Sequence, residues 1–189
     1  MRGFIIIAML AGFAAPVARA SAEPLQIHVC SGYSCTYRTS LSVGHQMRQR
    51  FQEIMQPGRH SPEAERAAIA AAVQFFERQA TKAIGVADKA KGSFAGSRVL
   101  GQMDCIDEST NTQALLHLLN RLGLLRHHRV EANASRGFFL DRRYPHATAV
   151  IRAPDGRRWA VDSWYEPAGG APDIMPLAHW RQRGVLGER

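Results

Sequence analysis

Three side chains in the second half of the chain have the types and the order of a thiol nucleophile, its base and a carboxylate that orients the base. Cys105 stands where a helix is expected to begin, and His146 and Asp162 stand on two consecutive expected strands. In a thiol enzyme the imidazole takes the proton of the thiol, and the carboxylate fixes the tautomer of the imidazole. The order therefore predicts a Cys-His-Asp triad.

The residues around Cys105 carry the signals of a helix N-terminus. Asp104 is a favourable N-cap residue, Asp107 is a second acceptor for the free amides of the first turn, and an apolar run from Ala114 continues the helix to about Leu122. Free amides and the helix dipole favour a thiolate by up to about 1 kcal/mol. The two aspartates raise the thiol pKa, so most of the activation must come from the histidine.

The segment 146–164 is typical of a β-hairpin. Residues 146–152 and 158–164 have strand character, and Pro154-Asp-Gly-Arg between them is a turn signal. Antiparallel pairing brings the start of the first strand, His146, beside the end of the second, Asp162. A lone cysteine at a helix start is more often a small buried hydrophobe, and a lone His or Asp at a strand end is usually on the surface. Their ordered combination favours the triad.

These residues resemble a known family. The helix that begins with cysteine, the strand that opens with His146 and the strand 159–162 are similar to the transglutaminase-like superfamily, and most of all to the exported bacterial transglutaminase-like cysteine proteinases. The resemblance covers about residues 101–164. It implies a papain-like core, with Cys105 as the nucleophile, His146 as the base and Asp162 as the orienting residue.

The expected fold class is α+β, with a central nucleophile helix packed on an antiparallel sheet and additional N-terminal helices. A strand at 25–29 and helices at 43–55 and 62–84 precede a loop at 86–100, and another strand begins near His127. Residues 21–189 form one domain, divided into a helical part up to about residue 100 and a catalytic core from about residue 101. The segment from Met175 to Trp180 is expected to return over the core.

Three further side chains are candidates for the site. The backbone N–H of Cys105 and the side chain of Gln102 are candidate oxyanion donors, although Gln102 is equally well a solvated loop residue. Trp164 and Tyr165 follow the second strand and are candidates for lining a substrate groove, with core packing as the alternative.

The N-terminus has the pattern of a secretory signal peptide. A short basic start is followed by an apolar stretch at 4–17 and a small-residue cleavage site, which predicts a signal peptide over residues 1–20 and an exported protein, periplasmic or secreted. A retained membrane anchor is the alternative, but the stretch is short and contains Gly12 and Pro16. An oxidising compartment favours a disulfide between Cys30 and Cys35, which leaves Cys105 free. A redox pair or half of a metal site is the other interpretation of the two cysteines.

The charge of the chain favours anionic partners. The formal net charge is +8, and loss of residues 1–20, which hold two arginines and no acid, lowers it to +6. Anionic peptide or protein substrates and contact with lipid headgroups suit such a surface. The arginines are scattered without interleaved aromatic residues, so a nucleic-acid partner is not predicted.

No cofactor or metal is required by the predicted chemistry. Some of the similar proteinases bind calcium through acids beside the nucleophile; Asp104 fits such a position, but Ile106 stands where an acid would be expected. His117, His127 and His128 suggest zinc, but two adjacent strand residues face opposite ways, and satisfied or exposed histidines are the better interpretation.

The expected function is that of an exported thiol-dependent hydrolase or acyltransferase, which acts on a peptide or amide bond through an acyl-thioenzyme. Two alternatives from other classes stay open at this point. One is a noncatalytic binding domain of the same fold in the cell envelope. The other is a basic structural protein in which Cys105 belongs to the core.

Overall fold

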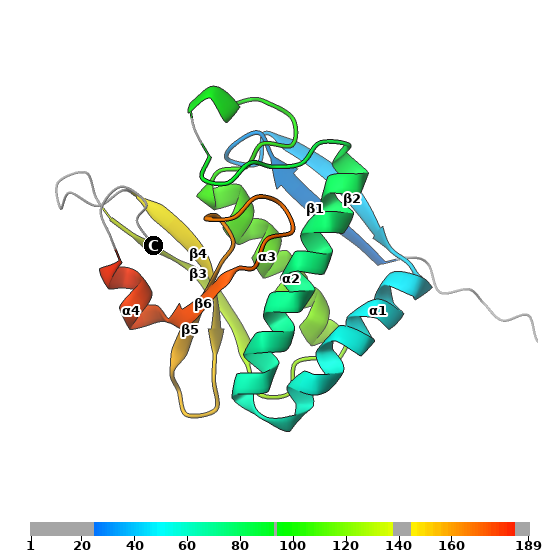
Figure 1. Cartoon of the computed structure of the whole chain (residues 1–189), viewed down its shortest axis with the longest axis vertical. Helices are drawn as coiled ribbons and strands as arrows, with labels where there is room; N and C mark the ends of the chain where they lie inside the picture. Colours follow the sequence, from blue (N-terminus) through cyan, green and yellow to red (C-terminus); the bar gives the residue numbers. More distant parts are fainter. Residues whose placement is uncertain (1–24, 93, 138–144, 184–189) are drawn as a thin grey trace, which may run out of the picture.

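Helices and two antiparallel sheets are mixed along the chain, in agreement with the predicted α+β class. The computed structural model describes residues 25–92, 94–137 and 145–183 (Figure 1). The predicted signal peptide, residues 1–20, lies outside the described residues. Within the described ranges, no helix has both the length and the apolar character needed to span a bilayer.

The described chain opens with a two-stranded antiparallel sheet. β1 (Leu25–Ser31) pairs with β2 (Tyr37–Val43), and the predicted strand at 25–29 is thereby confirmed. Sequence reasoning missed β2. The predicted helix at 43–55 begins later, as α1 (His45–Met55), because Val43 pairs with Leu25 in the sheet. The helix ends at the predicted residue, and a 3-10 turn, η1 (Gln56–His60), follows it directly.

α2 (Pro62–Ile84) has both of its predicted ends. The Ser61 hydroxyl accepts a hydrogen bond from the Ala64 N–H at 3.0 Å, and Gly85 ends the helix with a left-handed φ of 86°. A loop follows, as predicted, and contains only the short 3-10 turn η2 (Phe94–Gly96) among its described residues.

α3 (Cys105–Arg121) is the central helix of the molecule. Asp104 caps it as predicted, because its Oδ1 accepts hydrogen bonds from the N–H groups of Ile106 and Asp107 at 3.1 and 2.8 Å. Figure 1 shows α3 between α2 and the second sheet, and it also contacts β1. Its leucines are fully buried on several sides, which confirms the predicted core helix: Leu115, Leu116, Leu118 and Leu119.

The second sheet has four antiparallel strands in chain order. They are β3 (Arg129–Arg136), β4 (His146–Arg152), β5 (Arg158–Asp162) and β6 (Asp173–Pro176), and α4 (Leu177–Gln182) follows. β4 and β5 form the predicted hairpin. The predicted start of β3 at His127 is two residues early, since the carboxylate of Glu65 accepts the N–H groups of Arg126, His127 and His128 and holds them outside the sheet.

The alternation of side chains along β4 separates two packed layers. Ala149 and Ile151 belong to the large core around α3, whereas Val150 packs with Trp180 of α4 on the opposite face. His146 has the same parity as Val150. The sheet therefore presents the imidazole on its α4 face, at the end of β4.

Candidate functional site

The structure brings His146 and Asp162 together at one end of the β4–β5 hairpin. Ala149 pairs with Val161, so His146 and Asp162 lie at the same end of the two strands. The imidazole Nε2 and the carboxylate Oδ2 are 2.8 Å apart, and both side chains are only 2% exposed. The two residues therefore have the contact that the hairpin register predicted.

The indole of Trp180 holds Asp162 from the other side. Its Nε1–H donates to Oδ2 of Asp162 at 2.6 Å, and the backbone N–H of Trp164 donates to Oδ1 at 3.3 Å. These donors fix the carboxylate against the imidazole. Sequence reasoning missed Trp180 as a site residue, because nothing in the segment after residue 175 indicates that its indole reaches a carboxylate 18 residues away.

Three aromatic rings enclose the imidazole. The ring centroids of Trp164, Tyr165 and Trp180 lie 4.8, 5.8 and 5.6 Å from that of His146. Trp164 and Tyr165, predicted as residues of a substrate groove, are 8% and 5% exposed. They form the wall of the histidine pocket, and contact with substrate stays a prediction for both.

The second ring nitrogen of His146 is buried and has no hydrogen-bond partner among the described residues. A carboxylate can only accept, so the hydrogen of the bond to Asp162 belongs to Nε2, and in the neutral imidazole Nδ1 then carries a free lone pair. Native proteins rarely leave a buried polar atom unpaired, and exceptions often have a functional cause. The imidazole is therefore fixed in the tautomer that a general base requires.

Cys105 lies next to the start of β4. It is half-buried in the first turn of α3, and the backbone N–H of Ala147, the residue after His146, donates to its sulfur. The thiol and Nδ1 are not hydrogen-bonded to each other here. Catalytic hydrogen bonds are often long in a free enzyme and shorten when substrate binds.

The environment of Cys105 favours the neutral thiol. Burial is the largest cause that raises the pKa of Cys105 to about 11; the negative charges of Asp104 and Asp162 act in the same direction, and the Ala147 N–H acts against them. The prediction that an aspartate beside the nucleophile opposes the thiolate agrees with this result. The thiolate can form readily only when a base takes the proton.

Asp107 accepts the backbone N–H of Asp104 at the start of its own helix, in agreement with its predicted role, and it also accepts two N–H groups from a distant segment. Its Oδ2 accepts from the Tyr33 N–H at 2.8 Å and its Oδ1 accepts from the Cys35 N–H at 2.5 Å. Both donors belong to a loop about 70 residues earlier, so only the tertiary structure reveals this contact.

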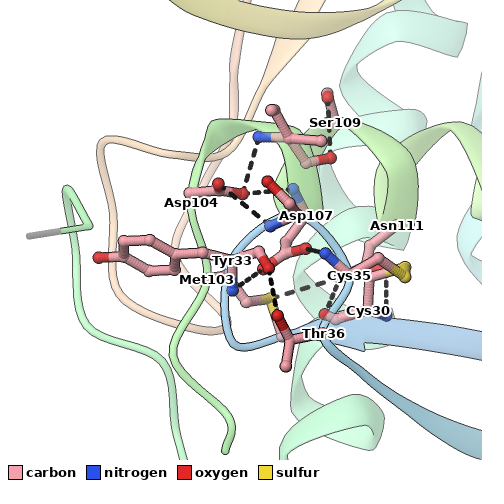
Figure 2. Close-up of a disulfide and its surroundings, with 11 residues drawn as sticks. Cys30, Tyr33, Cys35, Thr36, Met103, Asp104, Asp107, Ser109 and Asn111 are labelled. Carbon is pink, nitrogen blue, oxygen red and sulfur yellow. Dashed lines mark hydrogen bonds between the residues drawn. A yellow bond between two sulfur atoms is a disulfide. The ribbon is translucent and has the colours of Figure 1, made fainter. Parts of the chain in front are cut away.

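That loop is closed by the predicted disulfide between Cys30 and Cys35, and among the described cysteines Cys105 is free. We call residues 30–35 the disulfide loop. Gly32, Tyr33, Ser34 and Cys35 all have left-handed φ angles, of 83°, 70°, 50° and 59°. The conformation costs roughly 1–2 kcal/mol for each non-glycine residue. Figure 2 shows the disulfide loop against the first turns of α3, whose polar side chains hold it.

Gln102, the candidate oxyanion donor, is engaged by its own loop. Its side-chain amide donates to the Ala87 carbonyl at 3.1 Å, and its backbone carbonyl accepts from the Gly32 N–H at 2.6 Å. A role in stabilising an oxyanion stays a prediction for Gln102 and for the Cys105 N–H.

Three buried carboxyl groups form a cluster behind the hairpin that sequence reasoning missed. The hydroxyl of Ser163 donates to Glu108 Oε2 at 2.6 Å, Glu108 and Asp88 share a hydrogen bond, and Glu77 accepts from the Gly169 N–H at 2.6 Å. Burial raises the pKa of Glu77 to about 7 and that of Asp88 to about 6, and it raises the pKa of Glu108 well above its usual value. The cluster therefore retains protons close to neutral pH.

Two of the three histidines considered for zinc have other partners, and the third, His117, is exposed. His128 is buried, and its Nδ1 lies 2.8 Å from Glu65 Oε2, while Nε2 of His127 lies 3.2 Å from the Arg59 carbonyl. Within the described ranges, no set of three or more His, Cys, Asp or Glu side chains is arranged to hold a metal ion. Asp104, the residue considered for calcium, caps α3, and Ile106, the residue after Cys105, is exposed.

Comparison of the chain with protein-family models, with curated proteins and with solved structures finds no match.

Proposed function

We propose that the protein is a thiol-dependent hydrolase or acyltransferase that acts on peptide or amide bonds and has a transglutaminase-like, papain-like core. The observation that carries the proposal is the buried His146–Asp162 pair. Nδ1 of His146 has no hydrogen-bond partner among the described residues, and the next residue, Ala147, donates its backbone N–H to the sulfur of Cys105. A neutral thiol, an oriented imidazole and a fixed carboxylate are the three groups that the chemistry needs.

The proposed reaction begins with proton transfer from the Cys105 thiol to Nδ1 of His146 as the sulfur attacks the carbonyl carbon. Asp162 stabilises the resulting imidazolium through Nε2–H. The tetrahedral intermediate collapses, the C–N bond breaks, and the imidazolium returns the proton to the leaving amine. Water or a second amine then attacks the acyl-thioenzyme, His146 removes the proton of the attacking group, and the thiol is regenerated with the acid or the new amide as product.

The raised pKa of Cys105 supports general-base catalysis in place of a resting thiolate. At a pKa of about 11, roughly one thiol in ten thousand is ionised at pH 7. Proton transfer must then accompany attack on the substrate. This order requires a base with a free lone pair beside the thiol, which is the role we assign to His146.

Three cationic side chains beside the histidine pocket favour an anionic peptide or protein substrate. The guanidinium of Arg136 donates to the Tyr165 hydroxyl at 3.0 Å, and the cationic groups of Lys91 and Arg183 lie 5.8 and 5.1 Å from the Tyr165 ring. Arg136 is also paired across the sheet with His146. A substrate with an acidic group near the scissile bond would meet favourable charge there.

The Cys30–Cys35 disulfide is consistent with export, and we propose a periplasmic or secreted protein. Its basic surface would also favour contact with anionic membrane surfaces.

Turnover of peptide and amide libraries by the wild type and by Cys105→Ala tests the proposal. We expect cleavage above background only with the thiol present, and added amines should appear in the product if the enzyme transfers acyl groups. Equal turnover by the two proteins would contradict the proposal.

A noncatalytic binding domain of the same fold is the second candidate, favoured by the neutral, half-buried thiol. In that case, peptides selected from the library would bind equally well to the wild type and to Cys105→Ala, and neither protein would release a product.

A further inference from the structure

We propose that the disulfide loop positions the nucleophile, so that closure of the Cys30–Cys35 bond makes the thiol site competent. Asp107 and Asn111 are the positioning residues that connect the loop to α3. The inference rests on the proposed function and adds a regulation of the same site.

Side chains from the first two turns of α3 bind the backbone of the disulfide loop. Asp107 accepts the N–H groups of Tyr33 and Cys35, one on each oxygen. Asn111 lies one turn later on the same face; its Oδ1 accepts the Cys30 N–H at 2.7 Å and its Nδ2 donates to the Cys30 carbonyl at 2.9 Å. Figure 2 shows both side chains directed at the loop. The disulfide loop thus holds the helix that begins with Cys105.

The segment before Cys105 is hydrogen-bonded to the same disulfide loop. The Gly32 N–H donates to the Gln102 carbonyl at 2.6 Å, and the Gly101 N–H donates to the Ser31 hydroxyl at 3.2 Å. The N-cap residue is held too, because Asp104 Oδ2 accepts from the Ser34 N–H at 3.2 Å. Residues 31–34 therefore hold the segment before Cys105, in addition to the contacts that Asp107 and Asn111 make after it.

The backbone of the disulfide loop needs the disulfide to present these groups. Its consecutive left-handed residues include Tyr33, Ser34 and Cys35, for which this conformation is unfavourable. An open chain would relax toward ordinary φ angles and turn the Tyr33 and Cys35 N–H groups away from Asp107. Asp107 is fully buried, so its carboxyl group would lose these two donors and α3 would shift at its first turn.

Closure is a two-electron oxidation. The thiols of Cys30 and Cys35 lose two protons and two electrons, the S–S bond forms, and a disulfide-bearing oxidant of the exported compartment is reduced to two thiols. In a reducing compartment the cysteines stay as thiols. The enzyme would then gain its activity only after export.

The experiment compares the oxidised wild type, the wild type reduced with a phosphine and Cys30→Ser/Cys35→Ser. One readout is the rate at which iodoacetamide labels Cys105, followed by peptide mass spectrometry over a range of pH. The other is amide hydrogen exchange of the peptide that spans Cys105. Opening the loop should slow the His146-dependent labelling about tenfold or more and speed exchange at the start of α3, while circular dichroism retains the folded signal.

Asp107→Asn is a second variant that keeps the disulfide. Asparagine has one acceptor oxygen in place of two, so it can keep only one of the hydrogen bonds from the Tyr33 and Cys35 N–H groups. The variant should reproduce part of both effects, whereas Asp155→Asn, in an exposed turn, should change neither. Unchanged exchange and labelling after the loop is opened would overturn the inference. If faster exchange occurs but Cys105 never shows His146-dependent labelling, the positioning role stands and the proposed function fails.

Discussion

Replacement of Glu77 by glutamine should stabilise the protein above neutral pH and leave it unchanged in acid. Glu77 is a half-buried residue of α2, and its buried Oε1 has no hydrogen-bond partner among the described residues. Burial raises its pKa from 4.5 to about 7. A carboxyl group whose pKa is raised by folding supplies stability below its unfolded pKa, and that stability is lost as the pH rises through the folded value.

The size of the effect follows from the shift in the pKa of Glu77. A difference between 4.5 and about 7, at 1.36 kcal/mol per unit, makes the wild type about 3 kcal/mol less stable at pH 8 than at pH 4 through this group alone. Glutamine has nearly the same shape and can still accept the Gly169 N–H that now binds Oε2 at 2.6 Å. Glu77→Gln should therefore gain up to about 3 kcal/mol over the wild type at pH 8.

Urea unfolding at pH 4.5 and pH 8 measures the difference, provided that the slope of free energy against urea is the same for both proteins. Glu63→Gln is the control, because Glu63 is exposed in the first turn of the same helix. It removes a favourable charge at the helix N-terminus, so it should be slightly less stable at pH 8. A Glu77→Gln variant that is no more stable than the wild type at pH 8 would refute the reasoning.

Three other changes have defined outcomes. Asp162→Asn should lower kcat by two or more orders of magnitude with little effect on KM, because the amide can stabilise the wrong tautomer of His146. Equal kcat for the wild type and the variant in steady-state assays would exclude the role of Asp162 in orienting His146. Trp180→Phe removes the indole donor to Asp162 and should lower kcat by about tenfold. Trp180→His keeps an N–H, so it should recover part of the lost kcat if the hydrogen bond to Asp162 is the cause. Lys91→Ala should raise KM for acidic peptides but not for neutral ones. Lys89 is exposed, and Lys89→Ala should leave both KM values unchanged. Equal effects of the two variants on acidic peptides would contradict a subsite at Lys91.

Elements with strong local signals were predictable from the sequence. The ends of α2 follow from Ser61 and Gly85, the start of α3 follows from Asp104, and the hairpin follows from its turn and its alternating strands. The same local signals placed His146 at the same end of the hairpin as Asp162. Sequence reasoning could reach this contact because antiparallel pairing across a short turn leaves few registers.

Contacts between distant segments were not predictable in the same way. β2 was missed because its sequence is mostly polar, and β6 was missed because it is only four residues long; each is defined by its partner strand. Two partners of Asp107 lie in the disulfide loop, and the partner of the Trp180 indole lies on another strand. Such polar contacts leave no periodic signal, since each depends on tertiary packing that places two segments side by side.

The rate at which iodoacetamide labels Cys105 at pH 7 in the wild type and in His146→Ala tests most directly whether the imidazole takes the proton of the thiol. The wild type should react faster than His146→Ala, because only the wild type keeps a base that can take the proton of the thiol as it attacks iodoacetamide. The same chain denatured in urea is the reference. His146→Ala should react about a hundredfold more slowly than the denatured chain, because burial holds the pKa of Cys105 near 11, against about 8.5 for a free thiol. Equal labelling rates for the wild type and the variant would contradict the role of His146 as the base.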